Sequence, residues 1–112
     1  MHEHSYADYE RRKSELLDVA HGILNGEVGI LEGSHAIAAI RHVIDPEQRD
    51  EDLLGLAGVE SQTDHLALGD LRGRWDPELL IEKEAEIARW ESFFRSTVLE
   101  CCRCIISSYG DG

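Results

Sequence analysis

The residues best suited to chemistry gather between positions 58 and 75, where no helical period is evident. The segment carries carboxylates, an imidazole, a hydroxyl, two guanidinium groups and an indole, at Glu60, Ser61, Asp64, His65, Arg72, Arg74 and Trp75. Two carboxylates and an imidazole could ligate a metal ion or share a proton. Loops held by a rigid scaffold are also enriched in functional residues. We therefore treat this set as the candidate functional loop.

Local turn chemistry is the alternative interpretation of the same residues. Ser61 and Asp64 have the spacing of a capping box, and both side chains bond readily to nearby backbone. A catalytic triad of Ser61, His65 and Asp64 is disfavoured, because neighbours in sequence rarely orient one another as a triad requires. The enzyme hypothesis that remains is a metal-dependent or carboxylate-based site built from Glu60, Asp64 and His65.

A second pattern that could bind a metal is Glu32-x-x-His35, with His42 seven residues later. On a helix this spacing places Glu32 and His35 on one face, as in di-iron bundles. Such a centre needs a second Glu-x-x-His pair, which the sequence lacks. A structural histidine that donates to a neighbouring group is the favoured interpretation, and we expect no metal and no cofactor.

Three cysteines, Cys101, Cys102 and Cys104, crowd one helical turn. Their odd number and their divergent directions on a helix argue against a disulfide framework. A structural zinc site would need a second cysteine pair, which the chain lacks. Reduced thiols are expected, with Cys101 packed as a small apolar side chain, and the role of the group stays open.

The chain is strongly acidic, with 11 Lys and Arg against 23 Asp and Glu and a formal net charge of −12. This balance argues against binding a nucleic acid or an anionic membrane through a basic surface. The densest acidic run forms a candidate interaction surface at Asp45, Glu47, Asp50, Glu51 and Asp52. A partner protein with a basic surface would complement it, although solvated helix faces have the same composition.

The 112 residues have room for one domain, so we expect residues 1–112 to form a single helical domain. No uninterrupted apolar run approaches the roughly 18 residues that cross a bilayer. No apolar stretch follows the first four residues as it would in a signal peptide. The expectation is a cytoplasmic protein without membrane contact.

Apolar spacing predicts the helices that must position these residues. The first spans about residues 6–25 and ends at Gly26, because glycine adopts a left-handed conformation cheaply. The second spans about 27–44. Gly33 lies in its apolar seam and would let a neighbouring segment approach closely.

Two Asp-Pro pairs predict the starts of the other helices. Asp45 would cap a short acidic helix at about 46–57. Asp76-Pro77 would begin a long helix that extends to about residue 107, with a break or kink as an alternative. The tail from Tyr109 onward is expected to fray.

These elements predict an all-α fold, a bundle of three to four helices with an irregular connection at about 58–75. A short strand pair is an alternative for part of that connection. The predicted core consists of Leu17, Ile23, Ile30, Ile37, Ile40, Ile44, Leu80, Ile87, Trp90 and Phe94. Because the last helix exceeds what a bundle of this size can cover, homo-oligomer formation is a further expectation.

Four stretches carry a resemblance: GEVGILEG at 26–33, GVESQTDHLALG at 58–69, Arg74-Trp75 and KEAEI at 83–87. In these stretches the chain resembles a family of short uncharacterised bacterial proteins, a domain of unknown function. The resemblance implies a stand-alone bacterial cytoplasmic domain and supplies no activity, cofactor or catalytic residue. It implies that segment 58–69 is a recurring motif rather than a spacer.

The leading functional hypothesis is a small acidic interaction protein that is not an enzyme. Its concrete version is an antagonist or immunity-type protein that neutralises a basic partner. It predicts a salt-sensitive complex that Asp50→Lys or Glu51→Lys would weaken. The alternative is the metal-dependent or carboxylate-based enzyme described above.

Overall fold

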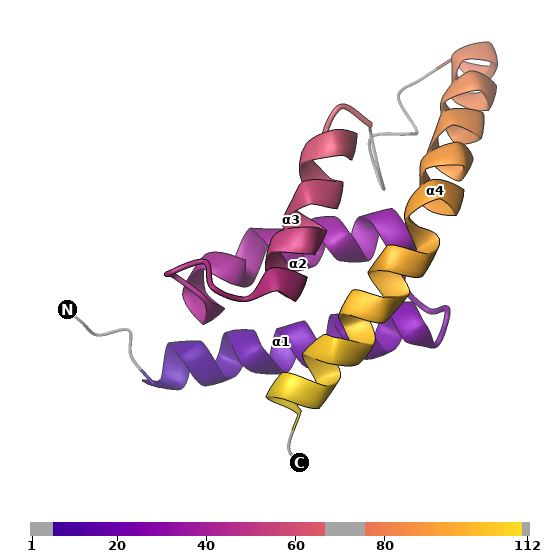
Figure 1. The fold of residues 1–112 in the computed structure, drawn as a ribbon. Helices are drawn as coiled ribbons and strands as arrows, with labels where there is room; N and C mark the ends of the chain where they lie inside the picture. Colours follow the sequence, from indigo (N-terminus) through magenta and orange to yellow (C-terminus); the bar gives the residue numbers. More distant parts are fainter. Residues whose placement is uncertain (1–5, 67–75, 111–112) are drawn as a thin grey trace.

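The computed structural model of this chain describes residues 6–66 and 76–110. These residues form four helices, α1 (Tyr6–Leu24), α2 (Ile30–Ile44), α3 (Glu51–Thr63) and α4 (Pro77–Tyr109). Figure 1 shows α1 and α2 as a helical hairpin, with α3 against α2 and α4 lying across the other three helices. The all-α prediction is confirmed. None of the described helices is both long and apolar enough to cross a membrane.

The turn between α1 and α2 follows the predicted signal. Gly26 adopts a left-handed conformation, with φ of 79°. The amides of Glu27 and Val28 donate back to the carbonyl of Gly22, at 2.8 and 3.0 Å. These bonds satisfy a carbonyl that the end of α1 would otherwise leave unpaired. α2 then begins at Ile30, three residues later than predicted.

The short acidic helix starts later than predicted. Asp45 is the C-cap of α2, and its carboxylate accepts hydrogen bonds from the amides of Arg49 and Asp50, at 3.1 and 2.8 Å. Asp50 caps α3 instead, accepting from the amides of Asp52 and Leu53 at 2.9 and 3.1 Å. The prediction chose the wrong aspartate, because both residues precede an acidic stretch that suits a helix start.

The irregular connection also begins later than predicted. α3 continues to Thr63, so residues 58–63 are helical and the strand alternative is wrong for the described residues 58–66. Leu53, Leu56 and Val59 are buried on one face of α3, and this packing holds the helix together despite its two glycines. Residues 67–75, with Arg72, Arg74 and Trp75, lie outside the described residues.

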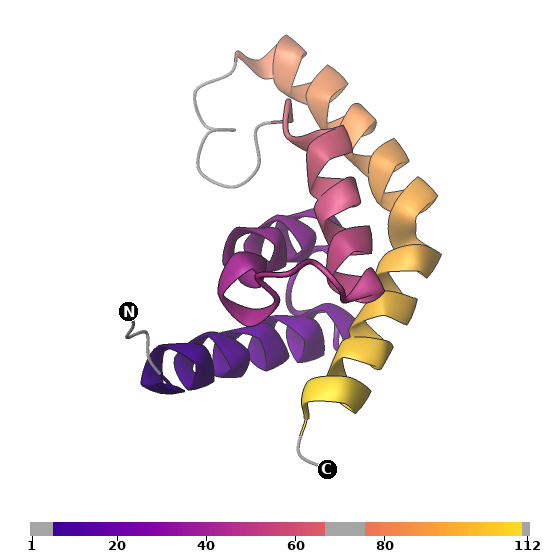
Figure 2. The same cartoon turned by 60° about the vertical axis from the view of Figure 1, so that its left-hand side comes forward.

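α4 is one continuous helix of 33 residues, about 50 Å long. Asp76 caps it by accepting from the amide of Leu79 at 3.1 Å, with Pro77 at its first position, as predicted. Figure 2 shows α4 curving around the other helices without a break. The fraying prediction is wrong for Tyr109, which is the last helical residue and donates its hydroxyl to Asp50 at 2.7 Å.

The core matches the predicted list in part. Five predicted residues are buried: Ile23, Ile30, Ile37, Ile44 and Ile87. The other five are only partly buried: Leu17, Ile40, Leu80, Trp90 and Phe94. On α1 the fully buried position is taken by Leu16 instead of Leu17. No described residue of α4 before Ile87 is buried, so the first turns of this helix reach past the core.

Gly33 provides the close approach that its place in the seam predicts. It is buried in α2 against the side chain of Ile23. A Cβ atom at Gly33 would lie only 2.5 Å from Cγ1 of Ile23 and 3.1 Å from Cγ1 of Val28. The α1–α2 hairpin therefore packs this closely because residue 33 has no side chain.

Candidate functional site

The described residues of the candidate functional loop lie in two places, on α3 and against α4. Glu60 and Ser61 lie on α3, and Asp64 is its C-cap. His65 reaches α4, where its Nε2 lies 3.1 Å from Oε2 of Glu86. Among the described residues, no hydrogen bond or ion pair joins His65 to Glu60 or Asp64. The described residues therefore place His65 in a hydrogen bond with Glu86 of α4 and do not join it to Glu60 or Asp64, as the enzyme alternative would require.

The bond with His65 lowers the pKa of Glu86, and the charge of Lys83 at 3.6 Å adds to the effect. Folding thus favours the ionised carboxylate. The resulting stabilisation is present above about pH 4.3, the pKa of an unfolded glutamate, and is lost as the pH falls through the lower folded-state pKa.

We expect Glu86→Gln to be less stable than the wild type at pH 6, and the two proteins to become equally stable near pH 3. Urea unfolding across this range measures the difference. Glu82→Gln, an exposed neighbour on the same helix, is the control and should show no such convergence. A stability gap that stays constant from pH 6 to pH 3 would contradict the role given to Glu86.

The Glu32, His35 and His42 set gives a structural contact rather than a ligand set. The buried Thr63 donates its hydroxyl to the carbonyl of Val59 at 2.7 Å. Because that proton is used, Nε2 of His35, at 2.8 Å from Oγ1 of Thr63, must be the donor. His35 therefore joins α2 to α3, as the structural interpretation predicts. Within residues 6–66 and 76–110, no three His, Cys, Asp or Glu side chains are placed to hold a metal.

Two acids of the candidate interaction surface, Asp45 and Asp50, form hydrogen bonds within the protein. Asp45 bonds to amides of the turn after α2, and Asp50 caps α3. Asp50 also accepts from Tyr109, whose pKa is raised by burial and further by this bond. Glu47 forms an exposed pair with Arg49 at 3.0 Å. Asp50→Lys would therefore remove a helix cap along with a charge, and it cannot report partner binding alone.

The two remaining acids of this surface, Glu51 and Asp52, lie near a carboxylate of α4, that of Glu100. Asp52 is partly buried, and desolvation raises its pKa, with contributions from the charges of Asp50, Glu51 and Glu100. Glu100 pairs with Arg103, whereas Glu51 and Asp52 have no ion pair within the described residues. We call Glu51, Asp52 and Glu100 the acidic end, in which Glu51 and Asp52 carry charges without an ion-pair partner among the described residues.

The cysteines are free, and Cys101 and Cys102 are buried. Burial raises the pKa of both thiols to about 11 and also raises the pKa of the more accessible Cys104. Cys101 packs against α3, where a Cβ atom at Gly55 would lie 3.3 Å from its sulfur. The expectation of a small apolar role for Cys101 agrees with this packing.

We expect Cys104 to be the thiol that a maleimide labels in the native chain at pH 7, and to react slowly because its pKa is raised. Cys101 and Cys102 should be labelled only in denaturant. Peptide mass spectrometry locates the label, and Cys104→Ser should abolish native labelling while Cys102→Ser leaves it unchanged. Labelling of Cys101 before unfolding would contradict the packing described above.

An aromatic cluster on α4 is a feature that the sequence predicts only in part. Trp90 and Phe94 stack with ring centroids 5.6 Å apart, and Phe93 meets Phe94 edge-on at 4.9 Å. Trp90 and Phe94, which were expected in the core, pack against it but are only partly buried, and Phe93 is 73% exposed. Adjacent residues on a helix point about 100° apart, so the Phe93-Phe94 pair itself signalled one outward-facing ring.

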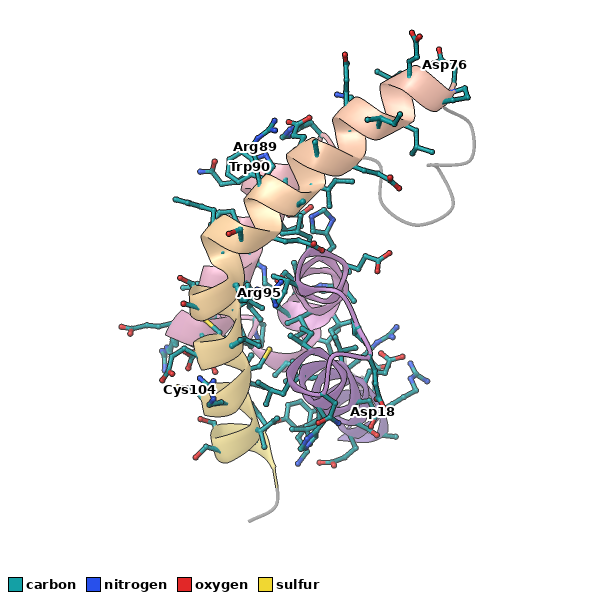
Figure 3. All side chains as sticks on the ribbon, turned by 90° about the vertical axis from the view of Figure 1, so that its right-hand side faces the viewer. Asp18, Asp76, Arg89, Trp90, Arg95 and Cys104 are labelled. Atoms are coloured by element: carbon teal, nitrogen blue, oxygen red, sulfur yellow. The ribbon has the colours of Figure 1, made fainter. Side chains whose placement is uncertain are left out.

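These rings border a groove between α3 and α4. It has a volume of about 450 Å³ and is lined by Gly55, Gly58, Val59, Gln62, Trp90, Phe93, Phe94 and Thr97. Gly58 leaves its α3 side open, since a Cβ atom there would meet nothing within 4 Å, whereas a Cβ atom at Gly55 would lie 3.3 Å from the sulfur of Cys101. A second hollow of about 500 Å³ adjoins it, lined by Glu86, Arg89, Trp90 and Phe93. We call this combined region the α3–α4 groove; Figure 3 shows where Arg89 and Trp90 lie on α4.

Comparison with known protein families, with curated proteins and with solved structures gives no match to this chain. The resemblance to short uncharacterised bacterial proteins therefore stays a prediction, and no function is carried over from it. The features on which a function can be based are the α3–α4 groove, its aromatic cluster and the acidic end beside it.

Proposed function

We propose that this chain is an interaction protein whose α3–α4 groove binds a partner protein with a basic surface. The observation that carries the proposal is Phe93, a large apolar side chain that is 73% exposed yet packed against Trp90 and Phe94 beside a hollow. Aromatic residues next to pockets are the usual anchors of protein interfaces, where a few of them contribute most of the binding energy. Exposed apolar clusters of this kind commonly mark interaction sites.

The groove lining supports binding rather than catalysis. Between α3 and α4 its described side chains are mainly apolar, with the amide of Gln62 and the hydroxyl of Thr97 as polar groups, while Glu86 and Arg89 line the adjoining hollow. Neither Gln62 nor Thr97 has a general base bonded to it among the described residues, and a nucleophile needs such a base. The enzyme alternative built from Glu60, Asp64 and His65 has no comparable observation in its favour.

The expected charge of the partner follows from the acidic end. The net charge of the chain is −12, and the raised pKa of Asp52 reflects burial together with the nearby negative charges. A cationic side chain bound beside Asp52 would relieve this repulsion, and the binding would weaken as salt screens the charges. An antagonist or immunity-type cytoplasmic protein that neutralises a basic partner is the finer form of the proposal.

The test compares two exposed apolar residues of α4. Partners are isolated with the tagged chain and identified, and calorimetry then measures the affinity of each purified partner for the wild type, Phe93→Ala and Ile81→Ala. Ile81 is 69% exposed but lies nine positions before Trp90, on the opposite side of the helix. Phe93→Ala should weaken binding about tenfold or more, and Ile81→Ala should leave it within about twofold. Equal effects of the two substitutions would overturn the proposal.

A further inference from the structure

We infer that the segment bound in the α3–α4 groove is one amphipathic helix of the partner. This helix is basic where it lies beside Glu51, Asp52 and Glu100, and acidic where it lies beside Arg89. The inference rests on the proposed function and adds the shape and the charge order of the ligand. Its three supports are the backbone that surrounds the groove, the glycines that line it and the opposite charges at its two ends.

The surrounding backbone favours a helical ligand. The described walls of the groove are α3 and α4, whose interior amides and carbonyls are already paired within each helix. They offer no strand edge for an extended peptide to join, whereas an apolar channel between helices suits a helix laid into it. Between Asp52 and Gln62, α3 rises about 15 Å, which a helix of about ten residues matches. Such a ligand would present apolar side chains at i, i+3 or i+4, and i+7.

The α3 side of the groove carries two glycines, and one of them, Gly58, lets the ligand approach closely. Gly55 and Gly58 are three residues apart and therefore lie on the same face of the helix. Both line the groove opposite Phe93 and Trp90. Each glycine costs a helix interior about 1 kcal/mol relative to alanine. Beside the aromatic cluster, the open space at Gly58 leaves room for an apolar side chain of the ligand, whereas the space at Gly55 is already bordered by the sulfur of Cys101.

The two ends of the groove differ in charge. The acidic end lies at the first turn of α3 and carries the unpaired Glu51 and Asp52. Arg89 lines the far hollow together with Trp90 and has no ion pair within the described residues (Figure 3). Glu86, the other charged residue among those described that line this hollow, is already paired with His65 and Lys83, so Arg89 supplies its unpaired charge. A ligand with basic and acidic ends in the matching order would satisfy both.

A second copy of this chain is a poor fit to the groove. Two copies would bring together net charges of −12 each, and like charges disfavour close association. A separate protein with a basic segment is the occupant to which the charges are complementary.

The test uses a displayed library of helical peptides with a fixed apolar stripe and with Lys, Glu or Ser allowed at each end. Selection is made on the wild-type chain, on Phe93→Ala and on Ile81→Ala. We expect enriched peptides to carry Lys at one end and Glu at the other, and to bind the wild type and Ile81→Ala at least tenfold more tightly than Phe93→Ala. Exchanging every Lys and Glu in an enriched peptide should weaken binding at least tenfold.

Charge reversal in the protein gives the matched control. The double variant Glu51→Lys, Arg89→Glu should restore binding of the exchanged peptide. The double variant Glu47→Lys, Arg95→Glu has the same net charge but alters exposed residues that do not line the groove, and it should restore nothing. Arg95 follows Phe93 by two positions and so points away from it.

The outcomes separate the two proposals. Enrichment that depends on Phe93 but shows no charge order would overturn this inference and leave the proposed function standing. Failure to enrich any peptide that distinguishes Phe93→Ala from Ile81→Ala would overturn the proposed function as well. Concentration-dependent dimerisation that Phe93→Ala abolishes, measured by sedimentation, would make a second copy the occupant and overturn the inference.

Discussion

Replacing Asp50 with alanine is expected to lower the free energy of unfolding by about 3 kcal/mol. Its carboxylate accepts from the amides of Asp52 and Leu53 at the start of α3, and loss of such a cap costs about 0.5–2 kcal/mol. It also accepts from the hydroxyl of Tyr109 at the end of α4, and a hydrogen bond to a charged group contributes about 1.5–3 kcal/mol. Urea unfolding followed by circular dichroism measures the change.

The matched control is Glu51→Ala, one residue along the chain. Glu51 is exposed and makes no described hydrogen bond, so the change in stability should stay within about 0.5 kcal/mol. Tyr109→Phe should cost about 1.5 kcal/mol alone and little more once Asp50 is alanine, because both substitutions remove the same bond. If Asp50→Ala and Glu51→Ala destabilise the protein equally, Asp50 is a solvated surface acid, as the sequence alone suggests.

Helix ends were predictable where a local signal was unambiguous. Gly26 and the Asp76-Pro77 pair fix the end of α1 and the start of α4 within one or two residues. The start of α3 was not predictable from such signals, because Asp45 and Asp50 both suit a cap. Its position is set by which face of the helix becomes buried, and that depends on α2 and α4 rather than on the adjacent sequence.

The candidate site depends on contacts between distant residues, and spacing could not predict them. Tyr109 meets Asp50 across 59 positions, and His65 meets Glu86 across 21. The predicted core correctly included Ile87, but apolar spacing could not show how far α3 covers the aromatic rings. That cover is incomplete partly because glycines occupy the facing side of α3. The groove is therefore a product of two helices, and only one of them carries a visible sequence signal.

Gly33→Ala is expected to destabilise the protein by about 2 kcal/mol, although alanine favours a helix over glycine by about 1 kcal/mol. The new Cβ atom would lie 2.5 Å from Cγ1 of Ile23, well inside normal contact distance. Ile23 is 3% exposed and β-branched, so its side chain has little freedom to move aside. Overpacking a core in this way typically costs about 1–3 kcal/mol, which outweighs the gain in helix propensity.

Gly58→Ala supplies the matched control, because the same substitution there should raise stability by up to about 1 kcal/mol. Gly58 is an exposed helical residue, and a Cβ atom on it would meet nothing within 4 Å, so only the propensity gain remains. Thermal unfolding of both variants measures their stability relative to the wild type, and we expect the two changes to have opposite signs. If Gly33→Ala also stabilises the protein, α1 and α2 can separate at no cost, and the hairpin is not held by the close contact at Gly33. If it destabilises as expected, the two glycines have opposite roles: Gly33 permits a contact within the chain, while Gly58 leaves a surface open at the expense of stability.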